Sequence, residues 1–464
     1  MIIVNKINFY SVAVGILLLI ISIITDEIFH LLGVFVSFYF ICKAKIEHII
    51  GLFLLYFLKS NFFSPSLPII SNNINGDLDF IESSVGFVIG GFPLNVATLS
   101  CAFISLRVFY EILFCPITFK NKVPNYLLYL WLISFIPALI AFVWSYQLGN
   151  PNWTRGLRFL MISGSYFYGF IFVKNLKNND KEHLLKIFFP FITLMIVLIY
   201  INVFWSHLSF LFVGFAGAFS FSFYFKRGFY NKFTGLLLVF LVLSIGITST
   251  LTLFFIAFSS CFFSYIINKP KRSHIYNKII DGSSKYMISL SIIFTFSIAY
   301  LGYYLDLSLL VDPNLQTSFS DRFVFKALVD RLPFWFAALE QIIEGPYFYV
   351  PSGRPFYINS IYYGASFEWI VGAHNVYLET LRNTGLIVGS VIILICLTAI
   401  KNNFKVLKYS TNKILQSLSI TVITVGLVGM TVGDFPIDMT VGFFLWSIAG
   451  FNYGLFLKSN NLKQ

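Results

Sequence analysis

Long apolar runs separated by short polar segments dominate this chain. Most of these runs reach the length of roughly 20 residues that an α-helix needs to cross a bilayer. The pattern therefore predicts an all-α polytopic membrane protein with about 12–14 transmembrane helices. The predicted spans are residues 8–24, 28–42, 46–63, 91–115, 126–147, 158–174, 185–203, 207–225, 234–248, 250–267, 286–304, 377–399, 414–432 and 438–457.

Residues 234–267 form a run that is too long for a single span. Its 34 residues carry no charge. As one helix they would extend about 51 Å, at roughly 1.5 Å per residue, against a hydrocarbon core of about 30 Å. The polar break Thr248-Ser249-Thr250 instead predicts a hairpin of two short helices.

The composition agrees with a membrane protein. Of the 464 residues, 58% are hydrophobic and 11% are charged, whereas soluble domains carry about a quarter charged residues. The net charge of +12 does not indicate a nucleic-acid partner, because the lysines fall between apolar runs and not on one soluble basic face. The five cysteines lie in or beside apolar segments without CxxC spacing, so no disulfide framework is expected.

Basic residues predict the orientation in the membrane. With the amino terminus in the cytoplasm, the basic clusters between the spans also fall there, as the positive-inside rule requires. This orientation gives residues 1–304 as transmembrane helices, 305–376 as a large periplasmic catalytic loop with short amphipathic helices, and 377–464 as C-terminal transmembrane helices. The clusters are Lys43/Lys45, Lys120/Lys122, Lys174–Lys186, Lys226–Lys232, Lys269–Lys285, Lys401–Lys413 and Lys458/Lys463.

Lysine and arginine are distributed differently in this topology. Only Lys59 and Lys326 fall outside, whereas five of the nine arginines do. Orientation treats the two residue types alike, but the planar guanidinium binds phosphate oxygens two at a time. The bias predicts a phosphate-bearing ligand, with snorkelling or pairing to Asp312, Asp321 and Asp330 as the alternative. The outer arginines are Arg155, Arg158, Arg322, Arg331 and Arg354.

The outer arginines occur in two clusters. Arg155 and Arg158 lie three residues apart at the mouth of a helix, so they share roughly one face. The second cluster lies in residues 320–353, which read as two amphipathic helices on the membrane surface. The second of these helices restarts at Pro333 and is stopped by Gly345-Pro346, and Arg331 falls at the junction.

His374 and Asn375 stand where the large loop re-enters the membrane. Asn375 is predicted to cap a helix that begins at Val376, and the N-terminus of a helix favours anions. The sequence leaves two interpretations of His374 open. It is either part of a capping pair in an interfacial pocket or a functional group beside an anion site.

These residues resemble a known family. The run HNVYLETLRNTGLIVG, preceded by RLPFWFAALEQIIEGPYFYVPSG, is similar to the hallmark of the O-antigen ligase and O-antigen polymerase superfamily. The spacing of ten residues between Arg158 and Gly169 is similar to one found in the polymerases. The family pattern falls on Arg331, Trp335, His374, Asn375, Leu378 and Gly385.

The resemblance implies a glycosyltransferase of the bacterial inner membrane that acts on the periplasmic face. Its donor would be an undecaprenyl-pyrophosphate-linked glycan, with no cofactor and no metal. Arg158 and Arg331 would clamp the pyrophosphate, and His374 would act as general base or orient the phosphate. Arg155, Arg322, Arg354 and Asn375 are expected as further substrate contacts. Besides the lipid bilayer, a chain-length regulator is a candidate partner.

Three alternatives remain open from the sequence. A polymerase extends the lipid-linked chain, whereas a ligase moves it to lipid A–core, and their shared motifs do not separate them. A metal-dependent transferase would use Asp77 and Asp79, since paired carboxylates hold divalent cations. A lipid-linked oligosaccharide flippase belongs to another class, but transporters concentrate polar groups along a midplane pathway, and here polarity gathers in one outer loop.

Overall fold

Among the residues that the computed structural model describes, seven helices are long and apolar enough to cross a membrane. This finding agrees with the predicted all-α membrane protein. The predicted spans 8–24 and 46–63 and most of 185–203 lie outside the described residues. The described residues are 26–44, 87–89, 92–94, 96–120, 122–147, 155–176, 196–197, 199–200, 208–248, 250–269, 274–304, 331–344, 356–360, 365–369, 372–438 and 441–461.

Two of the spans are each built from two helices in sequence. α6 (Asn125–Ile133) continues into α7 (Phe135–Gln147), and α8 (Arg155–Ser163) continues into α9 (Ser165–Asn175). Other described elements are α2 (Asp26–Lys43), β1 (Phe87–Ile89), β2 (Phe92–Leu94), α5 (Val96–Phe114), the 3-10 helix η1 (Pro116–Thr118), α11 (Leu208–Tyr224), α14 (His274–Tyr304), α18 (Lys413–Val432), the 3-10 helix η5 (Phe435–Ile437) and α19 (Val441–Asn461).

The long apolar run is divided at the predicted place. α12 (Phe229–Thr248) ends and α13 (Leu251–Asn268) begins at the Thr248-Ser249-Thr250 break, and the two helices pack against each other. The side chain of Thr250 caps α13, because its Oγ1 accepts a hydrogen bond of 3.3 Å from the Leu253 backbone N–H. The predicted hairpin of two helices is therefore confirmed.

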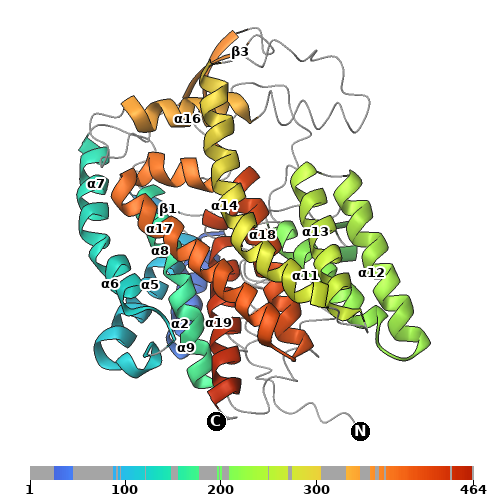
Figure 1. Ribbon diagram of the computed structural model, residues 1–464. Helices are drawn as coiled ribbons and strands as arrows, with labels where there is room; N and C mark the ends of the chain where they lie inside the picture. The colour runs from blue at the N-terminus through green and yellow to red at the C-terminus, as the bar shows by residue number, and fades with distance from the viewer. Residues whose placement is uncertain are drawn as a thin grey trace.

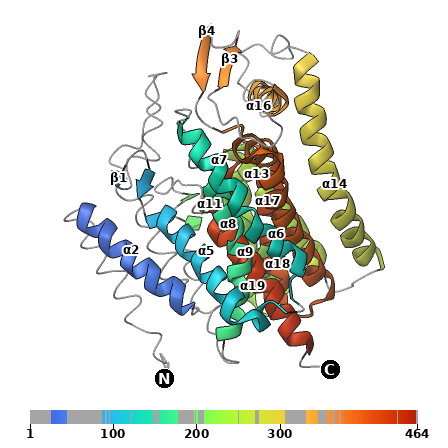
Figure 2. The same cartoon turned by 90° about the vertical axis from the view of Figure 1, so that its left-hand side faces the viewer.

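The helices form a buried centre and an apolar periphery. α8 with α9, α17 (Val376–Tyr409), α18 and α19 lie between α2 and α5 on one flank and α14 on the other (Figure 2). Large apolar side chains on the outer helices are exposed, among them Ile136 on α7, Phe240 on α12 and Ile293 on α14. Such a surface is costly in water and suited to lipid.

The bundle has two chemically different ends. At one end, which we call the lysine end, lysines hold the helix termini together, and α19 finishes there (Figure 1). At the other end lie α16 (Leu332–Glu344) and strand β3 (Phe356–Ser360), and we call it the histidine end (Figure 1). The contacts at the lysine end join Lys174 to Glu111, Lys408 to Asp281, Lys413 to the Ile267 carbonyl and Lys458 to the Leu176 carbonyl.

The loop before the histidine end contains one expected and one unexpected element. α16 includes Pro333 in its first turn and ends immediately before Gly345-Pro346, as predicted. The first of the two expected surface helices lies outside the described residues. β3 pairs antiparallel with β4 (Ala365–Trp369), which the prediction of amphipathic helices alone did not include. β4 alternates apolar and polar residues, and β3 begins with Phe, Tyr and Ile, which favour strands.

α17 (Val376–Tyr409) is interrupted near its beginning. Gly385 has φ 73° and ψ 172°, a conformation that essentially only glycine adopts. It separates a short first segment, residues 376–384, from the long apolar part of the helix, and the bend is visible in Figure 1. The bend leaves a short polar segment at the histidine end, and this segment carries most of the side chains described next.

Candidate functional site

Asn375 fixes the start of α17. Its Oδ1 accepts a hydrogen bond of 3.1 Å from the Leu378 backbone N–H, which confirms the predicted helix cap. Its amide nitrogen donates to the Thr431 carbonyl at 2.7 Å and to Thr295 Oγ1 at 3.1 Å. The side chain, which was expected to contact substrate, is buried and ties α17 to α18 and α14.

His374 stands directly before this cap in an unusual backbone conformation. Its φ is +52°, in the left-handed region that costs a non-glycine residue free energy. The imidazole is partly exposed, with Nδ1 3.7 Å from Asp434 Oδ1, and the Phe334 ring of α16 meets it edge to face at 6.3 Å between centroids. The left-handed turn thus presents the imidazole to a carboxylate at the end of α18.

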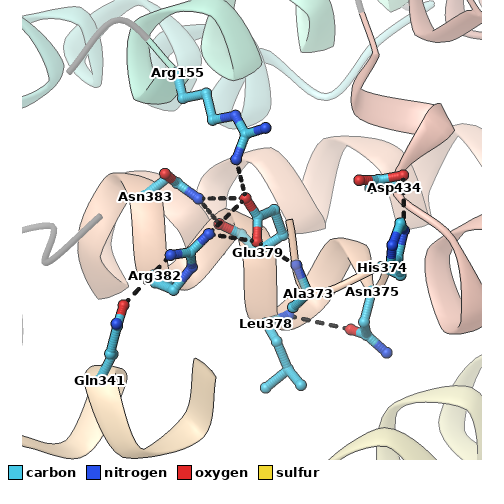
Figure 3. A network of polar contacts seen from close by, with 10 residues as sticks. All are labelled: Arg155, Gln341, Ala373, His374, Asn375, Leu378, Glu379, Arg382, Asn383 and Asp434. Carbon is cyan, nitrogen blue, oxygen red and sulfur yellow. Dashed lines mark hydrogen bonds and ion pairs between the residues drawn. The ribbon is translucent and has the colours of Figure 1, made fainter. Parts of the chain in front are cut away.

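Glu379 lies one turn into α17 and collects donors from three segments of the chain (Figure 3). Arg155 Nη1, from α8, is 2.9 Å from Oε1, and Arg382 Nη2 is 3.0 Å from each carboxylate oxygen. The Asn383 amide donates to Oε1 at 2.8 Å, and the Ala373 backbone N–H donates to Oε2 at 2.8 Å. The carboxylate is almost fully buried, and these charge-assisted bonds offset its loss of hydration.

Gly372 allows the two acidic side chains to approach the same backbone segment. A Cβ atom at this position would lie 2.9 Å from Asp434 Oδ2 and 3.0 Å from Glu379 Cδ. Any larger residue would therefore have to displace at least one carboxylate. The segment Gly372–His374 is consequently held between Glu379 on one side and Asp434 on the other.

The predicted arginines reach this end of the bundle on different helices. Arg155 contacts Glu379 directly and keeps 19% of its side-chain surface exposed. Arg158, one turn further along α8, is buried, and Arg331 directly precedes α16. Both α8 and α16 pack against α17, and Gln341 of α16 accepts from Arg382 Nη1 at 3.4 Å. Arg322, Arg354, Asp77 and Asp79 lie outside the described residues.

The sequence interpretation did not select Glu379, Arg382, Asn383 or Asp434 as site residues. The first three lie after His374 on one helix. Arg382 and Asn383 are three and four residues beyond Glu379, a spacing that places all three on one face and is a recognisable local signal in an otherwise apolar span. Asp434 has no such signal. It lies far along the chain, between α18 and η5, and only the packing of these elements brings it to His374.

The described part of the chain offers a base with a neighbouring carboxylate and guanidinium groups, and contains no group of three or more His, Cys, Asp or Glu side chains arranged to hold a metal. Such an arrangement can take a proton from a hydroxyl group and stabilise negative charge nearby. Comparison of the chain with protein-family models, with curated proteins and with solved structures finds no match.

Proposed function

We propose that this chain is a membrane glycosyltransferase that polymerises undecaprenyl-pyrophosphate-linked oligosaccharide repeat units on the periplasmic face of the inner membrane. The observation that supports the proposal best is the meeting of His374, Asp434 and Arg155 around the first turn of α17. Transfer of a glycan from a lipid pyrophosphate needs a base for the acceptor hydroxyl and cations for the leaving group.

The base half of the site consists of His374 and Asp434. When Asp434 accepts the Nδ1 proton of the imidazole, Nε2 is left as the acceptor of a proton, as in other histidine–carboxylate pairs. The acceptor hydroxyl oxygen attacks C1 of the donor sugar while its proton passes to Nε2. The bond between C1 and the pyrophosphate oxygen breaks, and the electron pair leaves with the lipid pyrophosphate.

The cation half consists of the outer arginines. Arg331 and Arg158 clamp the pyrophosphate in this proposal, with Arg155 and, from the large loop, Arg322 and Arg354 as further contacts. Guanidinium groups fixed before the reaction stabilise the charge that develops on the departing oxygen without reorganisation. The buried contacts of Arg155 with Glu379 support such preorganisation.

The proposal is tested by replacing His374 or Arg331 with Ala in cells that make a laddered surface polysaccharide. Each variant should abolish polymer while leaving the amount of membrane-embedded protein unchanged. A normal ladder from either variant would remove that residue from the site. Transfer that persists in EDTA is expected, and its loss would favour the alternative through Asp77 and Asp79.

Deletion of the gene separates the proposed polymerase from its alternatives. A single repeat unit on lipid A–core indicates a polymerase, because ligation and membrane crossing still occur. A bare core indicates a ligase. Accumulation of lipid-linked repeat units on the cytoplasmic side, with no surface glycan, indicates a flippase.

A further inference from the structure

Glu379 was not predicted as a site residue, yet its carboxylate binds donors from several segments of the candidate site. The carboxylate is the acceptor shared by α8, by the first turn of α17 and by the backbone before His374. It therefore contacts both halves of the proposed site, the arginine of the cation half and the segment that carries the base.

The link to His374 runs through one backbone hydrogen bond. The Ala373 N–H donates to Glu379 Oε2 at 2.8 Å, and the next residue adopts the left-handed conformation that aims the imidazole at Asp434. Asn375 fixes the other side of the turn through the cap and the Thr431 carbonyl. A strained turn persists only when its surroundings determine it on both sides, and Glu379 supplies one of the two anchors.

The link to the cation half runs through Arg155. Its Nη1 is 2.9 Å from Glu379 Oε1, while the same side chain keeps part of its surface exposed at the histidine end. A guanidinium has five N–H donors, so an arginine held by one carboxylate retains donors for phosphate oxygens. Arg382, in contrast, is fully buried and binds the Glu379 carboxylate from inside the bundle.

We propose that Glu379 is a positioning residue that couples the two halves of the site: one buried carboxylate holds Arg155 for the pyrophosphate and His374 for the acceptor hydroxyl. This inference rests on the proposed function. The carboxylate itself does not touch the reacting atoms. Its loss displaces both groups together, so its effect differs from that of an ion pair that merely joins two helices.

The test uses Glu379→Gln in the full-length protein in lipid nanodiscs, with lipid-linked repeat units extracted from cells that lack this chain as the donor. We expect kcat to fall by about 100-fold, the size of effect that a misplacement of about 1 Å produces. We also expect KM for the donor to rise, because Arg155 is released. A purely structural role would only reduce the folded fraction, which lowers the apparent kcat and leaves KM unchanged.

The chain offers a matched control in Glu111. This carboxylate is also buried and is held by two cations, Arg107 at 2.8 Å and Lys174, but it lies on α5 at the lysine end. Glu111→Gln should leave KM unchanged. In the double variant with Arg155→Lys, the free-energy losses calculated from kcat/KM should add for Glu111→Gln. The corresponding losses for Glu379→Gln and Arg155→Lys should not add, because those two residues act as one unit. Additive losses for the Glu379 pair would overturn the inference.

A second readout does not depend on activity. The rate at which diethyl pyrocarbonate modifies His374, followed on the peptide that contains it, should change in Glu379→Gln and stay at the wild-type value in Glu111→Gln. If the wild-type protein transfers no glycan, the proposed function fails, and this rate alone decides the coupling to His374. An unchanged rate overturns it. If Glu379→Gln does not accumulate, Glu379→Asp, which keeps the charge and shortens the side chain, takes its place in both measurements.

Discussion

Gly372 has no side chain, yet the geometry of two carboxylates depends on it. A methyl group at this position would meet the ends of Asp434 and Glu379, which are side-chain atoms that can shift without moving the backbone. We therefore predict that Gly372→Ala folds normally but loses at least about 90% of transfer activity, because His374 no longer meets Asp434 correctly. The measurement is the polymer ladder together with the thermal unfolding midpoint of the purified protein.

Gly282 provides the matched control for this substitution. It lies in α14, where an added Cβ would meet only Tyr286, at 3.9 Å. Gly282→Ala should leave the ladder unchanged and should not lower the unfolding midpoint, because alanine favours a helix more than glycine does. A Gly372→Ala protein with a wild-type ladder would show that the approach of the two carboxylates to this segment is unimportant for transfer.

Asp434 is predicted to act on the reaction through His374. Asp434→Asn keeps the shape of the side chain but replaces a carboxylate oxygen with an amide, so the imidazole loses its negatively charged partner. Because general base catalysis contributes roughly 100-fold or more, we expect kcat to fall at least tenfold. Donor KM should change little, since the base half does not bind pyrophosphate. Asp281→Asn, which breaks the ion pair with Lys408 at the lysine end, should leave kcat unchanged.

Helices, their ends and their breaks were largely readable from the sequence. Asn375 caps α17, the long apolar run divides between Thr248 and Thr250, and α16 includes Pro333 in its first turn and stops before Gly345. Each of these features depends on a few neighbouring residues. The β3–β4 hairpin and the bend at Gly385 were not predicted. Short strands and a single glycine within an apolar run leave only a weak signal in the pattern.

The contacts between side chains of the candidate site could not be predicted from the local sequence pattern. Arg155 and Glu379 are 224 positions apart, and only the packing of α8 on α17 brings them together. The sequence singled out Arg155 through charge distribution, and His374 and Asn375 through the predicted helix cap. It could not show that Glu379 binds Arg155 and the Ala373 N–H, because a charged residue in a span gives the same sequence pattern whether it is paired or not.

The close packing of α9 against α19 explains the glycine at position 169, which belongs to the Arg158–Gly169 spacing. Gly169 lies on α9 where α9 crosses α19, and an added Cβ would overlap the Ser447 carbonyl and lie 2.5 Å from Phe451 N. We predict that Gly169→Ala destabilises the protein by about 1–3 kcal/mol, as overpacking does. The protein should accumulate less and unfold at a lower temperature. Full accumulation with lost transfer would instead place Gly169 in the site, and Gly282→Ala again controls for the change to alanine.

The two ends of the bundle make the predicted orientation testable with two positions. Glu344, the last residue of α16, and Arg227, between α11 and α12, are both exposed. α16 lies at the histidine end, and α11 connects to α12 at the lysine end (Figure 1). Glu344→Cys and Arg227→Cys are introduced separately after the exposed Cys42 and the partly exposed Cys115 are replaced with serine. In cells with a permeable outer membrane, a membrane-impermeant maleimide should label Cys at 344 but not at 227.

The expected asymmetry has one physical cause. Lysines that hold the helix termini at one end resist transfer across the bilayer. We therefore expect that end to stay in the cytoplasm and the end with His374 and the arginines to face the periplasm. Disruption of the inner membrane should make position 227 reactive, which shows that its cysteine is accessible in the folded protein. Labelling of 227 but not 344 in intact cells would put His374 on the cytoplasmic side. A donor presented in the periplasm could not reach it there, and the proposed polymerase would be wrong.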